Sequence, residues 1–529
     1  MKSSVPFRAA VAAVVLLAAV ALAIDGCGKD EETETTRTLR IYVSQPLKGD
    51  RGGEDMLRAV EIANEDEGGT IGPARIEIVG MNDSDESGNW VASLVRRNAR
   101  RAAADDSAVA YIGDFDSGAT EVAMPILNRA GMLQVSSSAT AVKLTKPLPE
   151  LGEQIRPTGI RTFGRVVPND NVQAAALALF MDQESVNEVF VVDDGDTYGE
   201  GLRFRFEKVA RHTGIEITGG ATVTRSIQIG DVAKRVIGSG ADALLFAGSN
   251  LDLARDLFET VHREDNFIKL FGGDGLSLSS FLGSLGDTGL DTYITAPQLP
   301  AGNYARSGES FLRGFQERYG RPAEPMAVFA YEAGHVVIDS IRKGTRGDIA
   351  TEPIDALRQN TRNAFFDTSE RASPLGSYSI DTNGDTTLTF YGAYRVEDGQ
   401  LVLGRTIDVP PSSFGRTSDE HPAYLPGDPR GGMPGHRDLD PAGPQVRPRT
   451  PEGQRRAPRA RLRFRRRALR PGDRFRPRLR ARRLPDRRDR SRHRSRFGQF
   501  PFPRGYSFRC REPGPDRPRT DLLLPRRCR

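Results

Sequence analysis

The chain contains little cysteine, histidine or tryptophan. Its 529 residues include three cysteines, six histidines and one tryptophan. The cysteines stand at positions 27, 510 and 528, so no disulfide bond can form within the stretch from 28 to 509. Neither a CxxC pair nor a grouping of His with Cys occurs, which argues against a structural zinc site. A body of this size must therefore be stabilised by its hydrophobic core.

Sequence signatures of hydrolytic enzymes are also missing. The chain has neither a G-x-S-x-G elbow nor an HExxH motif, and its six histidines have no paired nucleophile context. We therefore expect a protein that is not an enzyme, with no catalytic residues, metal or cofactor. An exported hydrolase is kept only as a third hypothesis.

Lysine is absent from the last part of the chain. Residues 411–529 contain 34 arginines, no lysine and 12 acidic residues, a net charge of +22. Subtracting these from 75 basic and 70 acidic residues leaves 41 and 58 in residues 1–410, a net charge of −17. An acidic body argues against general nucleic-acid binding, which needs a basic face.

The basic segment at 410–529 is rich in Arg and Pro and shows no sustained apolar periodicity, so it cannot bury enough surface to fold alone. Three interpretations are open. The segment could bind anionic surfaces or nucleic acid, it could be an inert disordered extension, or it could be the product of a GC-rich gene read out of frame after a frameshift. The complete absence of lysine favours the third.

The beginning of the chain has the pattern of an export signal. Lys2 and Arg8 precede an apolar run of 16 residues, 9–24, which is short for a membrane span and suits a signal peptide. The run ends in Ile24-Asp25-Gly26-Cys27. This resembles a bacterial lipoprotein signal, with residues 1–26 removed, Cys27 lipidated and 27–37 serving as a tether. A plain secretory signal is the alternative.

Two consecutive strand ends carry hydroxyl groups. Residues 109–112 read as a strand, followed by Ser117-Gly118-Ala119-Thr120 where a helix should begin. A second apolar run, 132–135, leads into Ser136-Ser137-Ser138-Ala139-Thr140. Strand carboxyl ends meet at one edge of an open α/β sheet, where ligands bind and helix N-termini attract anions. Ser and Thr commonly only cap helices, but two such loops in succession favour a site for a carboxylate or similar small anion.

Strand and helix patterns alternate along the body, which predicts parallel sheets with helices on both faces. The first series has strands at 39–43, 76–79 and 109–112, with helices at 54–65 and from Trp90 onward. After a Pro/Gly-rich break at 146–159, a second series has strands at 189–192, 215–217, 243–246, 268–271 and 292–295, and helices at 171–181, 201–212, 229–237 and 251–261. Helices at 311–319 and 327–341 precede paired strands with turns at Asn383-Gly384 and Asp398-Gly399. The repeat of one pattern indicates two similar lobes.

Short motifs follow one another in a fixed order between residues 38 and 409. They are Pro46-Leu47-x-Gly49, Asn64 with Gly68-Gly69, Ile112-Gly113 with Ser117-Gly118-Ala119-Thr120, Ser138-Ala139-Thr140 with Leu144-Thr145, Tyr198-Gly199-Glu200-Gly201-Leu202, Gly273-Asp274-Gly275, and Gly376-x-Tyr378 with Asp381-x-Asn383-Gly384. This ordered set resembles the type I periplasmic binding proteins, specifically the leucine/isoleucine/valine-type substrate-binding proteins of bacterial ABC transporters.

The resemblance implies an α/β fold of two doubly wound parallel-sheet lobes, joined by a three-segment hinge and closing on a ligand. Lobe one would comprise 38–157 plus 299–368, and lobe two 158–298 plus 369–409. The positions that match the family's carboxylate-binding residues are Ser117, Ser138, Ala139 and Thr140. Tyr198 would close over the ligand from lobe two, and Asp274 would take the α-ammonium. Gly248-Ser249-Asn250 offers small polar groups where many members have an aromatic side chain.

These features predict an extracytoplasmic solute-binding lipoprotein that delivers an amino acid, or a related amide or carboxylate, to the permease subunits of an ABC importer. The protein would be a monomer anchored to the membrane through its lipid. Its folded body would not bind nucleic acid. The alternative is a ligand-sensing extracytoplasmic protein that signals to a membrane receptor, and the absence of a permease gene nearby would favour it.

Overall fold

The structure is a computed structural model that describes residues 37–49 and 52–409. The predicted signal peptide (1–26), the Cys27 lipidation site, the tether up to residue 36 and the tail (410–529) lie outside the described residues. Among the described helices, none combines the length and the apolar character needed to cross a membrane.

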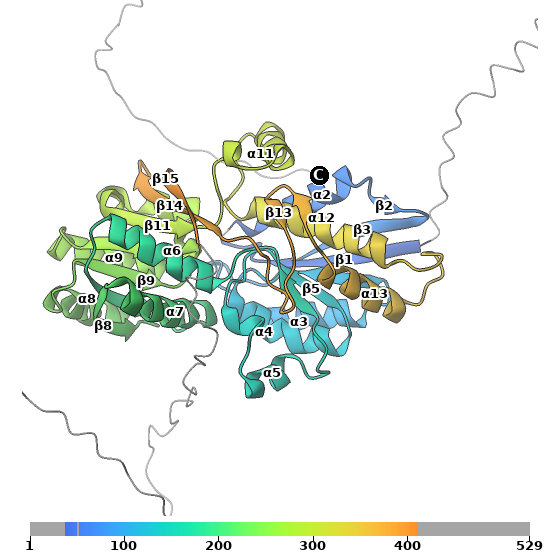
Figure 1. The fold of residues 1–529 in the computed structure, drawn as a ribbon, viewed down its shortest axis with the longest axis horizontal. Helices are drawn as coiled ribbons and strands as arrows, with labels where there is room; N and C mark the ends of the chain where they lie inside the picture. The colour runs from blue at the N-terminus through green and yellow to red at the C-terminus, as the bar shows by residue number, and fades with distance from the viewer. Residues whose placement is uncertain (1–36, 50–51, 410–529) are drawn as a thin grey trace, which may run out of the picture. The chain divides into compact units, whose positions relative to one another are not determined.

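Lobe one is built on a sheet of six strands in the order β2-β3-β1-β4-β5-β6 (Figure 1). The strands are β1 (Arg37–Gln45), β2 (Thr70–Ile71), β3 (Ala74–Asn82), β4 (Ala108–Ile112), β5 (Leu133–Ser136) and β6 (Phe163–Arg165). All neighbours pair in parallel except β2 and β3. The helices are α2 (Gly53–Asp66), α3 (Ala92–Ala104), α4 (Ser117–Arg129), α5 (Pro149–Ile155), α11 (Arg306–Tyr319), α12 (Ala327–Gly344) and α13 (Ile354–Phe366).

Alternation along β1 explains why helices cover both faces of this sheet. Leu39, Ile41 and Val43 point into one core together with residues of α2, α12 and α13. Tyr42 points the other way and packs with residues of α3 and α4. Side chains in a strand alternate between the two faces, so the consecutive apolar residues at 41–43 are buried on both sides of the sheet.

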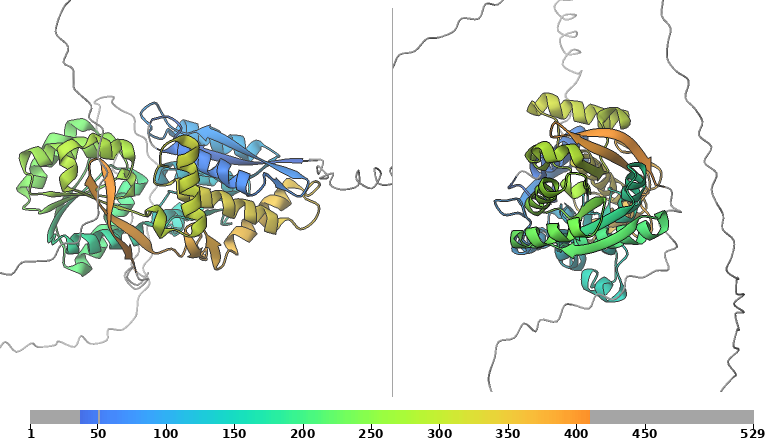
Figure 2. Two further views of the ribbon diagram at one scale, coloured as in Figure 1. Left: turned by 90° about the horizontal axis from the view of Figure 1, so that it is seen from above. Right: turned by 90° about the vertical axis from the view of Figure 1, so that its left-hand side faces the viewer.

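Lobe two is built on a sheet of seven strands in the order β15-β14-β11-β10-β9-β7-β8. The strands are β7 (Glu188–Asp193), β8 (Glu216–Thr222), β9 (Ala243–Ala247), β10 (Lys269–Gly272), β11 (Thr292–Ala296), β14 (Phe390–Glu397) and β15 (Gln400–Asp408). The helices are α6 (Asp170–Gln183), α7 (Thr197–Thr213), α8 (Ile229–Gly238), α9 (Leu251–Glu264) and α10 (Ser279–Ser284). Helices α6 and α7 share one core, and α8, α9 and α10 share another, so this sheet too is covered on both faces (Figure 2).

The antiparallel hairpin β14–β15 closes the second sheet at one edge, and its turn is Asp398-Gly399 as predicted. Both turn residues have positive φ, 50° and 70°, which is the geometry that favours Gly and Asp in two-residue hairpins. The other predicted turn, Asn383-Gly384, lies within a short antiparallel bridge between Ile380 and Thr386 rather than between sheet strands.

The chain passes between the two sheets three times, after β6, after β11 and after β13. The short strands β12 (Arg371–Ser373) and β13 (Gly376–Tyr378) pair with each other. Two boundaries differ from those drawn from the sequence. Strand β6 pairs with β5, so lobe one extends beyond residue 157. Leu375, Tyr378 and Leu388 pack into the core of lobe one, so residue 368 does not end its second part.

Three local predictions also need correction. Helix α5 occupies the stretch expected to be a break, because Pro149 stands in its first turn, where proline is tolerated. Helix α7 begins at Thr197, so Tyr198 lies in a helix rather than in a loop. Trp90 precedes α3 and forms a bridge with Ser84 instead of belonging to the helix.

Candidate functional site

Five of the six side chains predicted to bind a ligand line one cavity between the lobes. Ser117, Ser138 and Thr140 belong to lobe one, and Tyr198 and Asp274 belong to lobe two. The lining is completed by Phe115, Asp116, Ser249, Gly275 and Met326. The cavity has a volume of ≈ 20 Å³, enough for about one water molecule. A solute as large as an amino acid therefore enters only when the lobes separate or the lining side chains turn aside.

The lobe-one half of the cavity presents hydrogen-bond donors. Helix α4 begins at Ser117, and the loop after β5 carries Ser138 and Thr140, so the ends of two adjacent strands meet as predicted. The Ser117 hydroxyl accepts the N–H of Ala141 (3.2 Å), which leaves its own proton for another acceptor. The first N–H groups of α4 also lack partners within the helix, and they carry the positive end of its dipole. This half of the site therefore offers donors for an anion, beside the Asp116 carboxylate, which accepts from Ser249.

Ala139 does not line the cavity, unlike its neighbours in the predicted set. Its N–H donates to Ser136 Oγ (2.9 Å), and its carbonyl accepts from Arg165 Nη1 (2.6 Å). Both main-chain groups of Ala139 are thus used to hold the loop in place, which removes the reason for giving this residue a direct ligand contact.

The lobe-two half of the cavity is acidic. Asp274 is 5% exposed and accepts a hydrogen bond from the Tyr198 hydroxyl at its Oδ1 atom (2.6 Å), while its Oδ2 atom has no partner. Burial raises the pKa of Asp274 from 3.8 to about 6, against the opposing effect of the Tyr198 and Gln173 side chains. A buried carboxylate oxygen without a partner is costly, and a cation that binds there would relieve that cost.

Asp170 is a second buried carboxylate near this site, and the sequence reading missed it. Its side chain is 0% exposed, and neither oxygen has a hydrogen-bond partner, although the Thr140 hydroxyl is near enough to lower its pKa. Burial and then the charge of Asp274 raise the pKa of Asp170 from 3.8 to about 7. In the sequence, Asn169-Asp170 resembles a helix cap, yet Asn169 alone caps α6 by accepting the N–H of Asn171. The signal in the sequence that could have pointed to Asp170 is an acidic residue directly after an asparagine that already caps the helix.

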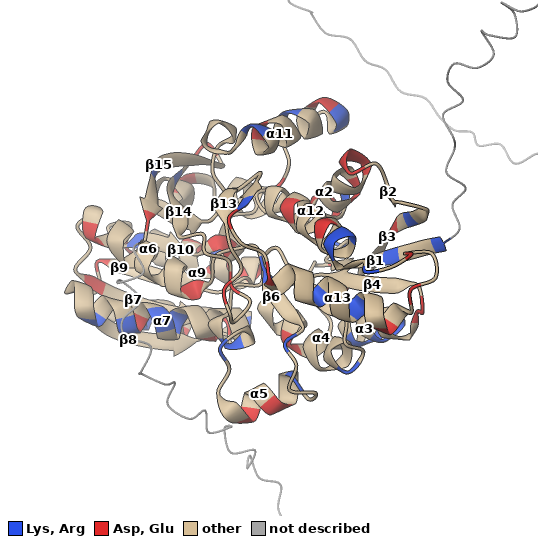
Figure 3. Cartoon of the chain, turned by 45° about the vertical axis from the view of Figure 1, so that its right-hand side comes forward, with Lys and Arg blue, Asp and Glu red and all other residues tan. Residues whose placement is uncertain are grey.

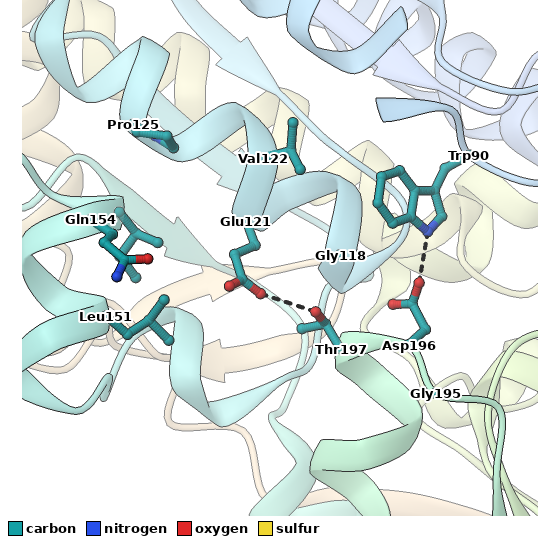
Figure 4. A pocket seen from close by; sticks show the side chains of 11 residues that line it. Trp90, Gly118, Glu121, Val122, Pro125, Leu151, Gln154, Gly195, Asp196 and Thr197 are labelled. Atoms are coloured by element: carbon teal, nitrogen blue, oxygen red, sulfur yellow. Dashed lines mark hydrogen bonds between the residues drawn. The ribbon is translucent and has the colours of Figure 1, made fainter. Parts of the chain in front are cut away.

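Side chains from the two lobes bond to each other around the cavity. The Trp90 indole N–H donates to Asp196 Oδ2 (2.9 Å), and the Thr197 hydroxyl donates to Glu121 Oε2 (3.0 Å), as Figure 4 shows. Closer to the predicted residues, the Ser249 hydroxyl donates to Asp116 Oδ1 (3.1 Å). We call these three hydrogen bonds the rim contacts. The first two line the larger pocket described next, the third lines the cavity itself, and all three join the two lobes.

The rim contacts require that the lobes approach closely at Gly118. A Cβ atom there would lie 2.8 Å from Asp196 Oδ1 of lobe two, and 2.7 Å from Trp90 Cζ2 of its own lobe. Outside this point, a larger pocket of ≈ 420 Å³ opens to solvent between α4, α5 and the start of α7. Elsewhere, acidic and basic positions are mixed along the helices of both lobes in the view of Figure 3, as expected of solvated faces. Among the described residues, no group of three or more His, Cys, Asp or Glu could hold a metal ion.

Residues 38–400 match the model of the periplasmic binding protein family, and this match covers well over half of the chain. The chain belongs to the periplasmic binding protein family. Its members are solute-binding proteins that are not enzymes and that act outside the cytoplasm. This periplasmic binding protein is accordingly a non-enzymatic, extracytoplasmic solute-binding protein. The two sheets, the three crossings and the cavity between the lobes agree with that membership.

Individual relatives are distant in sequence. The binding protein is 22% identical over 360 residues to the leucine-, isoleucine-, valine-, threonine- and alanine-binding protein of Pseudomonas aeruginosa, which covers 66% of this chain and 87% of the relative. It also resembles the crystal structure of a leucine-binding protein from Thermotoga maritima, with a TM-score of 0.60, 19% identity, and coverage of 70% and 99% of the two chains. An isoleucine complex from Streptococcus pneumoniae gives a TM-score of 0.59, 17% identity and coverage of 70% and 99%. At these identities the structural likeness establishes the fold alone.

Proposed function

We propose that this binding protein captures a small α-amino acid between its lobes and delivers it to the permease subunits of an ABC importer. The observation that carries the proposal is Asp274 Oδ2, a buried carboxylate oxygen without a hydrogen-bond partner. It lies in the same cavity as the hydroxyls of Ser117 and Thr140. An α-amino acid has the matching pair of charges, an ammonium for the first and a carboxylate for the second.

Ionisation of the acidic half supports an ammonium ligand. Above pH 7, Asp274, with a pKa of about 6, is ionised, and Asp170, with a pKa of about 7, is ionised in the larger part of the molecules. Two anionic side chains that have lost their hydration are held close together, which is unfavourable unless a positive charge accompanies them. The ligand ammonium would supply that charge, with Asp274 in contact and Asp170 contributing through its field.

The remaining lining of the cavity favours a small apolar or hydroxylated side chain. Phe115 and Met326 supply apolar surface, Gly275 supplies space, and Ser249 supplies a hydroxyl. The named ligands of the Pseudomonas aeruginosa relative include alanine and threonine beside the branched amino acids. We therefore place the solute among the small or branched aliphatic amino acids. Lipidation at Cys27, with the protein anchored to the membrane and facing the extracytoplasmic side, is also part of the proposal.

Calorimetric titration with matched ligands tests the proposal. L-alanine, L-threonine, L-valine and L-leucine are each compared with the corresponding carboxamide and with the acid that lacks the amino group. We expect one zwitterion to bind and both of its analogues to bind at least about 30-fold more weakly, which corresponds to about 2 kcal/mol for one lost buried charge contact. The single tryptophan provides a second readout, because Trp90 lies at a rim contact and its emission should change when the lobes close.

Two results would count against the proposal. Equal affinity for the acid without its amino group would remove the ammonium role of Asp274 while leaving a solute-binding protein. A lack of binding by all four amino acids in both assays would exclude this class of solute.

A further inference from the structure

Arg165, the last residue of β6, is a fully buried arginine whose three side-chain nitrogens all have partners. Its side chain is 0% exposed. Nε donates to Asp385 Oδ1 (2.9 Å), Nη1 to the carbonyl of Ala139 (2.6 Å), and Nη2 to the carbonyl of Ala141 (3.0 Å) and the hydroxyl of Thr145 (2.8 Å). Three of these four partners belong to the loop after β5, residues 137–145, which carries the predicted anion-binding residues.

The fourth partner connects Arg165 to the hinge. Asp385 lies in the third passage of the chain between the lobes, and it also accepts from Asn169 Nδ2 (3.0 Å), the cap residue of the first helix of lobe two. Lys146 Nζ is 3.1 Å from the same carboxylate. Burial by itself would raise the pKa of Asp385, but the charges of Arg165 and Lys146 hold this pKa below its ordinary value. We call Arg165 and Asp385 the hinge pair.

The contacts of Arg165 lie on both sides of one ligand-binding position. The Ala139 carbonyl belongs to the peptide group just before Thr140, and the Ala141 carbonyl to the second peptide group after it, so the guanidinium holds the backbone on both sides of Thr140. The N–H of Ala141 donates in turn to Ser117 Oγ. A shift of this loop would therefore displace Thr140 and change the hydrogen bonding of Ser117, although Arg165 itself does not line the cavity.

We propose that Arg165 is the positioning residue that sets the anion-binding hydroxyls of lobe one relative to the hinge. This inference rests on the proposed function, since it concerns how the same site holds a ligand carboxylate. A planar guanidinium can reach several acceptors in fixed directions, whereas the single ammonium of lysine cannot. Binding and hinge movement are thereby linked through one side chain, because the loop and two of the three crossings meet at the hinge pair.

A double-mutant cycle with Arg165→Lys and Thr140→Ala tests the inference through calorimetric affinity for L-leucine, L-valine, L-threonine and L-alanine. We expect Arg165→Lys to weaken binding at least tenfold in the wild-type background and less than threefold in the Thr140→Ala background. If Arg165 had a purely structural role, Arg165→Lys would reduce the affinity by the same factor in both backgrounds, and that result would overturn the inference. Arg318→Lys, in an exposed ion pair with Glu65 (2.6 Å), is the matched control and should leave affinity unchanged.

Hydrogen exchange of the ligand-free protein provides a test that does not depend on the solute. In Arg165→Lys, the amides of Ser138, Ala139 and Ala141 should exchange at least tenfold faster, while those of strand β9 in lobe two keep their rates. If Arg165→Lys does not fold, the nearly isosteric variant Asp385→Asn replaces it. This variant should also raise the exchange rates of the same amides. If no amino acid binds the wild type but this local effect is seen, the proposed solute is wrong and the positioning role stands. Unchanged loop exchange in both variants overturns the role.

Discussion

Asp274→Asn should make the ligand-free protein more stable and at the same time remove most of its affinity for an amino acid. Asn keeps the size of the side chain and an oxygen that can accept from Tyr198, which lies 2.6 Å from Asp274 Oδ1. It lacks the negative charge that burial makes unfavourable and that the ligand ammonium would require. The two effects have opposite signs, which distinguishes this prediction from a general loss of structure.

The size of the stability effect follows from the pKa of Asp274. Folding raises this pKa from 3.8 to about 6, a difference that corresponds to about 3 kcal/mol. Below pH 3.8 the carboxyl is protonated in both the folded and the unfolded state, so there is no penalty. As the pH rises from 3.8 to about 6, the unfolded state ionises first, and the penalty grows to its full value above pH 6. Asp274→Asn removes this penalty.

Thermal unfolding at pH 8 and pH 4 measures this difference. At pH 8 the Tm of Asp274→Asn should exceed that of the wild type by roughly 6–12 °C, on the basis of about 2–4 °C per kcal/mol for a unit of 150–250 residues. Near pH 4 the two proteins should unfold at similar temperatures. Asp231→Asn on α8, where the carboxyl side chain is 88% exposed, is the control and should change neither Tm nor affinity.

The affinity of the same variant completes the experiment. Losing one side of a buried charge contact costs about 2–5 kcal/mol, or at least about 30-fold in Kd. A variant that is less stable than the wild type at pH 8 would refute the account of the buried carboxylate. A variant that binds the amino acid as tightly as the wild type would refute the ammonium site.

Three further predictions concern the same cavity. Affinity for a zwitterionic amino acid should fall as the pH is lowered through about 7 and then 6, because Asp170 and Asp274 take up protons, and calorimetry between pH 5 and 8 measures the slope. Ser117→Ala should cost about 1–3 kcal/mol of binding to the amino acid but little of binding to its carboxamide, and equal losses would contradict the carboxylate contact. Gly118→Ala should weaken binding at least about tenfold, because its Cβ would lie 2.8 Å from Asp196 Oδ1 of lobe two when the lobes meet; unchanged Trp90 emission and affinity would refute this.

Much of the fold could be read from local pattern. Apolar runs at 109–112 and 243–246 correspond to the buried strands β4 and β9, because a strand covered on both faces needs apolar residues at consecutive positions. The pattern could not show which sheet a short strand joins. Strand β6 has three residues, and only its pairing with β5 places it in lobe one.

The candidate site was predictable to different degrees in the two lobes. The two hydroxyl-bearing loops, 117–120 and 136–140, follow from the rule that neighbouring parallel strands end at one edge of a sheet, and the choice of Ser117, Ser138 and Thr140 within them came from the resemblance of motifs. Tyr198 and Asp274 came from the resemblance of motifs, because each by itself reads as an ordinary turn residue. Asp170 was missed because it stands beside a helix cap, and only burial reveals that its carboxylate has no partner.

The sequence by itself determined the class of this protein: the alternation of strands and helices, the two lobes, the hydroxyl-rich strand ends and a cysteine-free body that depends on its core. These features depend on the periodicity of apolar residues, on the residues that form turns and on interactions between residues close in the sequence. The tertiary structure decided which distant groups meet. Arg165 bonds to Asp385 across 220 positions, and Trp90 to Asp196 across 106. Such contacts depend on how three crossings of the chain bring two independently patterned sheets together, and no local pattern records that.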